Sequence, residues 1–86
     1  MQPFNKLNID GKPYIDQGHY SYDSSTGSIN INFESKSQAF KVFLSHLRRT
    51  EKIRMLSFIF NESDANYVGP FIIDDIRDKS IILIRA

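Results

Sequence analysis

The chain of 86 residues contains no cysteine and no tryptophan, and its four glycines are scattered singly. The absence of cysteine excludes disulfides and thiolate metal ligands. Isolated glycines also exclude a glycine-rich loop that cradles phosphate. No apolar run approaches the about 20 residues needed to span a bilayer, and the N-terminal stretch lacks the apolar core of a signal peptide. We therefore expect a cytoplasmic protein with no membrane partner and no cofactor.

Alanine is scarce in the chain, whereas isoleucine, asparagine, lysine and serine are common. The codons for isoleucine, asparagine and lysine are rich in A and T, which indicates a bacterial or phage origin. The length predicts a single domain over residues 1–86. Because such a small domain hides only about 60–65% of its unfolded surface, each large apolar side chain matters for its stability.

Two β-hairpins are predicted in the N-terminal part of the chain. Asp10-Gly11 suits the two central positions of a type I′ turn, where both residues need positive φ. Pro13 cannot donate a ladder hydrogen bond and therefore indicates an edge strand. The second hairpin is predicted at about residues 18–34, where apolar and polar residues alternate. Its expected buried face comprises Tyr20, Tyr22, Ile29, Ile31 and Phe33.

One helix is predicted, at about residues 36–50. Ser35 and Gln38 have the spacing of a capping box, in which each side chain satisfies a free backbone donor of the other residue. The apolar residues that follow recur with the spacing of an amphipathic helix. These residues are Phe40, Phe43, Leu44 and Leu47.

The C-terminal part is predicted to contain a strand at 52–60, a polar loop at 61–66 and a third hairpin that turns around 77–79. The strand is apolar on both faces, with Ile53, Met55 and Ile59 expected on one side. Leu56, Phe58 and Phe60 are expected on the other side, and residues 81–84 are equally apolar. Strands of this kind need cover on both faces, which a single helix cannot give.

These elements predict an α+β fold with a mostly antiparallel sheet and the helix packed on one face, in the order ββ-ββ-α-β-ββ. The second face is closed either by the N-terminal hairpins curling over, as in a half-barrel, or by another chain. The predicted core comprises Tyr20, Ile31, Phe33, Phe40, Phe43, Leu44, Leu47, Leu56, Phe58, Phe71 and Ile82.

The stretch GHYSYD contains the residue types of a hydrolase triad, namely His19, Ser21 and Asp23. On a strand, alternate residues stand about 6.6 Å apart with parallel side chains, whereas a nucleophile and its base must approach within about 3 Å. Asp16 could extend the group toward a metal site, but no spacing typical of metal ligands is present. We therefore assign no catalytic or metal-binding residue and do not expect an enzyme.

The charge distribution gives the strongest functional signal. Residues 36–54 contain six basic residues and one acidic residue, whereas the rest of the chain is mildly acidic and the whole chain carries only +1. Cations near a helix C-terminus also offset its partial negative charge, so some of them are expected without any ligand. The predicted binding residues are Lys41, Arg48, Arg49, Lys52 and Arg54.

The sequence favours a small non-catalytic interaction protein, such as a binder, an inhibitor or an assembly subunit. Its expected partner is another protein or its own copy, bound through an apolar sheet face or an edge strand. The alternative is a nucleic-acid-binding accessory protein that uses the basic helix and the following strand.

Overall fold

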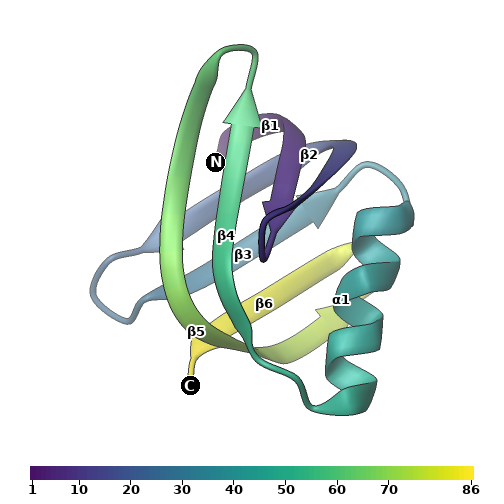
Figure 1. The fold of residues 1–86 in the computed structure, drawn as a ribbon, viewed down its shortest axis with the longest axis vertical. Helices are drawn as coiled ribbons and strands as arrows, with labels where there is room; N and C mark the ends of the chain where they lie inside the picture. Colours follow the sequence, from purple (N-terminus) through teal and green to yellow (C-terminus); the bar gives the residue numbers. More distant parts are fainter.

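The computed structural model describes residues 1–86 as six strands and one helix (Figure 1). Two antiparallel three-stranded meanders are connected by the helix, which takes the chain from the last strand of one meander to the first strand of the other. The elements are β1 Gln2–Ile9, β2 Lys12–Asp23, β3 Ser28–Phe33, α1 Gln38–Arg49, β4 Ile53–Phe60, β5 Ser63–Arg77 and β6 Ser80–Arg85.

The two meanders join along both outer strands to form a closed barrel in the order β1-β2-β3-β6-β5-β4. β1 pairs with β4 and β3 pairs with β6, both antiparallel. The prediction of a mostly antiparallel sheet with one helix is confirmed, whereas the half-barrel and the order ββ-ββ-α-β-ββ are replaced by a closed barrel with ββ-β-α-β-ββ. One strand fewer is needed because β2 serves both N-terminal hairpins.

The barrel interior accounts for most of the apolar residues that seemed too numerous for one helix to cover. The inward side chains of all six strands and of α1 form one core of 16 buried residues. Ile53, Leu56 and Phe58 of β4 all belong to it, and most of the predicted core is buried. The exceptions are Ile82, which lies on the outer face, and Leu44 and Leu47, which are only partly covered.

Two further sequence predictions are wrong for identifiable reasons. The predicted polar loop at 61–66 is a two-residue turn, Asn61-Glu62, after which β5 begins at Ser63. Its polar residues, including Asp64 and Asn66, lie on the outside of the barrel, so the stretch is polar without being a loop. The edge of the last hairpin, expected to be free, is paired with β3 through β6.

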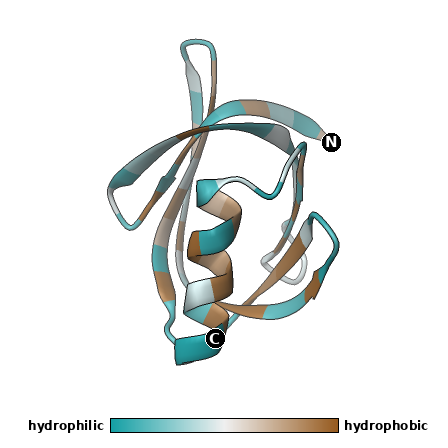
Figure 2. Ribbon diagram, turned by 90° about the vertical axis from the view of Figure 1, so that its right-hand side faces the viewer, coloured by the Kyte–Doolittle hydropathy of each residue, from teal (hydrophilic) through white to brown (hydrophobic).

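The helix α1 lies across the barrel (Figure 2), and its boundaries fall inside the predicted 36–50. Phe40 and Phe43 pack on Phe33, with ring centroids 5.8 and 6.0 Å away. The capping box is not formed, since Ser37 occupies the N-cap position. The Ser37 hydroxyl donates to the buried carboxylate of Asp16 in β2, which ties the start of the helix to the barrel wall.

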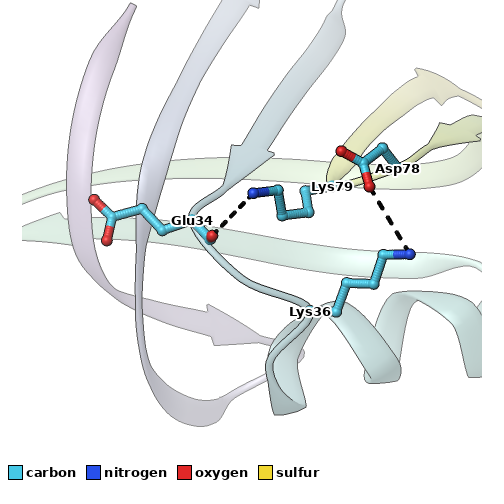
Figure 3. A network of polar contacts seen from close by, with 4 residues as sticks. All are labelled: Glu34, Lys36, Asp78 and Lys79. Carbon is cyan, nitrogen blue, oxygen red and sulfur yellow. Dashed lines mark hydrogen bonds and ion pairs between the residues drawn. The ribbon is translucent and has the colours of Figure 1, made fainter.

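The connection from β3 to α1 lies against the turn between β5 and β6 (Figure 3). The Lys79 ammonium donates to the Glu34 carbonyl oxygen at 3.3 Å, and Lys36 approaches the Asp78 carboxylate at 3.9 Å. Because the Lys36–Asp78 pair is exposed, it contributes little to stability. These contacts position the polypeptide before the helix.

Aromatic side chains fill the barrel around Phe58. Its ring stacks on Tyr20, with centroids 3.8 Å apart, and meets Tyr67 edge-on at 6.1 Å. Tyr22 packs on Tyr67 from the solvent side, at 4.7 Å. Burial raises the pKa of the Tyr67 hydroxyl to about 12, and a hydrogen bond with Tyr20 acts in the same direction. The Tyr67 hydroxyl is therefore neutral at physiological pH, and the cluster belongs to the packing of the barrel.

No helix in the structure has the length and apolar character that crossing a membrane requires.

Candidate functional site

The five predicted basic residues are all exposed, but they do not share one surface hollow. Lys41 lies on the first half of α1, beside a shallow hollow that contains no other member of the set. Arg48 and Arg49 lie in the last turn of α1, where they offset the partial negative charge of the helix end. Only Lys52 and Arg54 line the same hollow, at the start of β4.

That hollow is an open groove of about 840 Å³ between the start of β4 and the middle of β5. Its floor has an apolar pair, Met55 and Val68, which lie opposite each other on neighbouring strands. Met55 is 50% exposed and Val68 is 63% exposed, so the pair forms an apolar surface that solvent or a ligand can reach. We call this surface the basic groove, and it is lined by Thr50, Glu51, Lys52, Arg54, Met55, Val68, Gly69 and Pro70.

A β-bulge turns two consecutive β4 side chains outward into the groove. The register shifts between Ile53 and Met55, so that Ile53 is buried while both Arg54 and Met55 are exposed. The extra residue lies in β5, where Gly69 and Pro70 stand opposite Arg54 alone. It locally disrupts the ladder and leaves backbone donors to be satisfied in another way. Because of this shift, the strict alternation that we predicted for β4 placed Ile53 on the wrong face.

The carboxylate of Asp10 holds the bulge in place. Its Oδ1 atom accepts the backbone N–H groups of Arg54 at 2.8 Å and Met55 at 3.0 Å, and the Asp10 N–H donates to the Met55 carbonyl at 2.9 Å. Asp10 and Gly11 both have positive φ, as the predicted type I′ turn requires. The β1–β2 turn therefore fixes the backbone that carries the two outward side chains.

The opposite wall of the groove is built from β5 where it turns from β4 toward β6. A Cβ atom on Gly69 would lie 2.5 Å from the Ile53 carbonyl oxygen, so the two backbones approach as closely as glycine allows. The peptide bond between Gly69 and Pro70 is cis. From the β6 side, Arg85 donates to the Val68 carbonyl at 2.8 Å and lies over the Phe71 ring at 5.1 Å.

The groove has a net positive potential. Its one carboxylate, that of Glu51, lies 3.6 Å from the Arg49 guanidinium. Lys52 and Arg54 make no ion pair, and their side chains form no hydrogen bond within the chain. Two cations are therefore free beside an exposed apolar pair.

In the stretch GHYSYD, Tyr20 is buried and His19 is exposed on β2, whereas Tyr22, which we predicted to share the buried face, is 37% exposed. The Asp23 carboxylate accepts the Ser25 hydroxyl at 2.6 Å and the Ser25 N–H at 2.9 Å. These bonds hold the pKa of the Asp23 carboxyl below its ordinary value. Asp23 thus organises the β2–β3 turn. No three histidine, aspartate or glutamate side chains of the chain are grouped as metal ligands.

The sequence pointed to Lys52 and Arg54 but not to the rest of the groove. Met55 and Val68 were hidden among apolar strand residues, because neither the bulge nor the strand register is visible in the sequence. Gly69-Pro70 was the one available signal, since this dipeptide is typical of a chain turn.

Comparison of the chain with protein-family models, curated proteins and solved structures finds no match. The function is therefore inferred from the groove itself.

Proposed function

We propose that this protein is a non-catalytic protein-binding domain whose basic groove takes an acidic segment of a partner. The observation that carries the proposal is the combination of Lys52 and Arg54, free of ion pairs, with the exposed pair Met55 and Val68. Charges around an interface set its specificity and association rate, whereas a desolvated apolar or aromatic centre supplies most of the affinity. The preferred ligand has carboxylates on either side of one apolar or aromatic anchor.

The chemistry of the groove supports binding more than catalysis. The Thr50 hydroxyl donates to the Arg49 carbonyl at 2.6 Å, and the only carboxylate is beside a guanidinium. A nucleophile needs a base within hydrogen-bond reach, and no such pair lines the groove. Arg54 adds a planar donor that suits bidentate contact with a carboxylate.

The proposal predicts that a fluorescein-labelled peptide of glutamates around one phenylalanine binds the protein, as measured by fluorescence anisotropy. Lys52→Glu/Arg54→Glu should weaken this binding by at least about tenfold, because each lost attraction becomes a repulsion. Lys41→Glu/Arg48→Glu is the matched control, with the same charge change at two exposed positions outside the groove and an expected loss of less than about threefold. Equal losses in both variants would contradict the assignment of the groove.

Nucleic-acid binding through Lys41, Arg48, Arg49, Lys52 and Arg54 remains the alternative function. It predicts the opposite order of affinity losses with a labelled single-stranded DNA, since a phosphate-binding stripe along α1 should lose affinity when Lys41 and Arg48 are reversed. It also predicts a steep dependence on salt. The same two variants therefore discriminate between the two functions.

A further inference from the structure

The molecule has an acidic turn at one end, and the basic groove, for which we propose an acidic ligand, lies toward the other end. The β4–β5 turn lies at one end of the long axis, and the start of β4 lies toward the other (Figure 1). The molecule is 31 Å long in this direction. Both features thus belong to the same two strands, and neither can reach the other within one chain.

The β4–β5 turn projects beyond the paired part of the barrel. Its last pair, Phe60 with Ser63, lies beyond the final β1–β4 pair, which joins Lys6 to Ile59. Pairing with β6 begins only at Phe71, so the first residues of β5 hydrogen-bond to β4 alone. The main additional tie is between the Asn5 side chain and Asn61, at 3.3 and 3.4 Å.

This turn carries one partly exposed aromatic side chain, which is followed in the chain by two acidic residues. Phe60 is 42% exposed, and both Glu62 and Asp64 are exposed and make no ion pair. We call residues 60–64 the acidic tip. It has one apolar anchor and two carboxylates without an ion pair, of which that of Asp64 accepts the Asn66 side-chain N–H at 3.4 Å. The basic groove has one apolar pair, two cations without an ion pair, and the Glu51 carboxylate paired with Arg49.

We propose that the acidic tip of one molecule docks in the basic groove of a second copy of the chain. The inference rests on the proposed function and names its partner. The two surfaces are opposite in the sign of their net charge, and both expose apolar side chains. Opposite charge steers an association and fixes its register. Because the two surfaces differ and lie at opposite ends, the contact is heterologous and extends head to tail into rings or open chains.

The test uses two variants with opposite charge reversals. In Glu62→Lys/Asp64→Lys, the tip and the groove are both basic, and in Lys52→Glu/Arg54→Glu, both are acidic. Each variant alone should therefore remain monomeric in sedimentation-velocity and light-scattering measurements at low salt. An equimolar mixture should regain the concentration-dependent increase in mass of the unaltered protein, because every tip again meets a groove of opposite charge.

Matched controls separate these sites from general charge effects. Glu34→Lys/Asp74→Lys has the charge change of the tip variant, and Lys6→Glu/Lys41→Glu has that of the groove variant. These positions are exposed and lie outside both surfaces. Both controls should associate like the unaltered protein, and circular dichroism should show the same fold for all variants.

The inference is overturned if the unaltered protein stays monomeric at low salt and high concentration, if either reversed variant still associates, or if the mixture fails to regain mass. The proposed function is tested separately by the labelled peptide. Peptide binding that depends on Lys52 and Arg54, together with a strictly monomeric protein, would overturn self-association and leave the groove as a site for a different acidic protein.

Discussion

The Phe58→Ala variant is expected to lose about 3–5 kcal/mol of its unfolding free energy, the usual cost of truncating a buried phenylalanine. The ring is 2% exposed, stacks on Tyr20 and lies 5.4 Å from the Phe4 ring. A domain of this length has only about 4–13 kcal/mol in total. Loss of this one ring therefore removes a large share of the stability and leaves a measurable unfolded population in water.

Urea unfolding followed by circular dichroism measures this loss. Phe60→Ala is the matched control, since it makes the same substitution on the same strand at a position outside the core. Its expected cost is about 1–2 kcal/mol, because 42% of Phe60 is already exposed and less buried area is lost. Similar losses in the two variants would contradict the placement of Phe58 inside the barrel and Phe60 at the tip.

The Gly18→Ala variant is expected to lose about 3 kcal/mol or to fail to fold, since overpacking at a rigid contact is strongly destabilising. Gly18 is buried where β2 faces β3. An added Cβ would overlap the Asn32 carbonyl oxygen and lie 2.8 Å from the Phe4 ring. Because the closest atom belongs to the backbone, the strands would have to separate to admit a methyl group.

Gly11→Ala provides the comparison for this variant, since nothing lies within 4 Å of the position of its added Cβ. Its φ of 84° still disfavours alanine, which gives an expected loss of about 1 kcal/mol. Thermal unfolding of the two variants side by side measures the difference. If Gly11→Ala were the more harmful change, the close approach of β2 and β3 at Gly18 would be wrong.

Local structure could be predicted from the sequence where one residue type decides the conformation. Asp10-Gly11 predicted a turn in which both residues have positive φ, and the structure has this turn. The recurrence of Phe40 and Phe43 predicted the buried side of α1. These features depend on neighbours within a few residues, so no knowledge of the tertiary fold was needed.

Closure of the barrel could not be predicted in the same way, because it depends on pairings between distant strands. β4 was predicted to be covered on both faces, but its outer face is open, with Met55 50% exposed. The sequence also does not say which strands pair with β4. In the structure these strands are β1 and β5. The single strand β2 was divided between two predicted hairpins, with the second beginning at about residue 18. In the structure β2 continues through Gly18, which is the point of closest approach to β3.

The candidate site was predicted in part for a similar reason. Charge segregation pointed to Lys52 and Arg54, but charge alone could not distinguish these groove residues from Arg48 and Arg49 on α1. The bulge is what turns Arg54 into the groove, and Asp10 stabilises this bulge from 44 residues away in the chain. Contacts at this sequence distance create the groove, and they leave no local pattern.

The most direct test of the account is a ¹⁵N–¹H correlation spectrum of the protein during titration with the glutamate–phenylalanine peptide, at a concentration at which the protein is monomeric. Occupation of the basic groove predicts that the largest shifts fall on the amides of residues 50–55 and on Val68 and Gly69, while those around Lys41 stay in place. Shifts confined to α1, or no shifts at saturating peptide, would contradict the groove as the binding site of this protein.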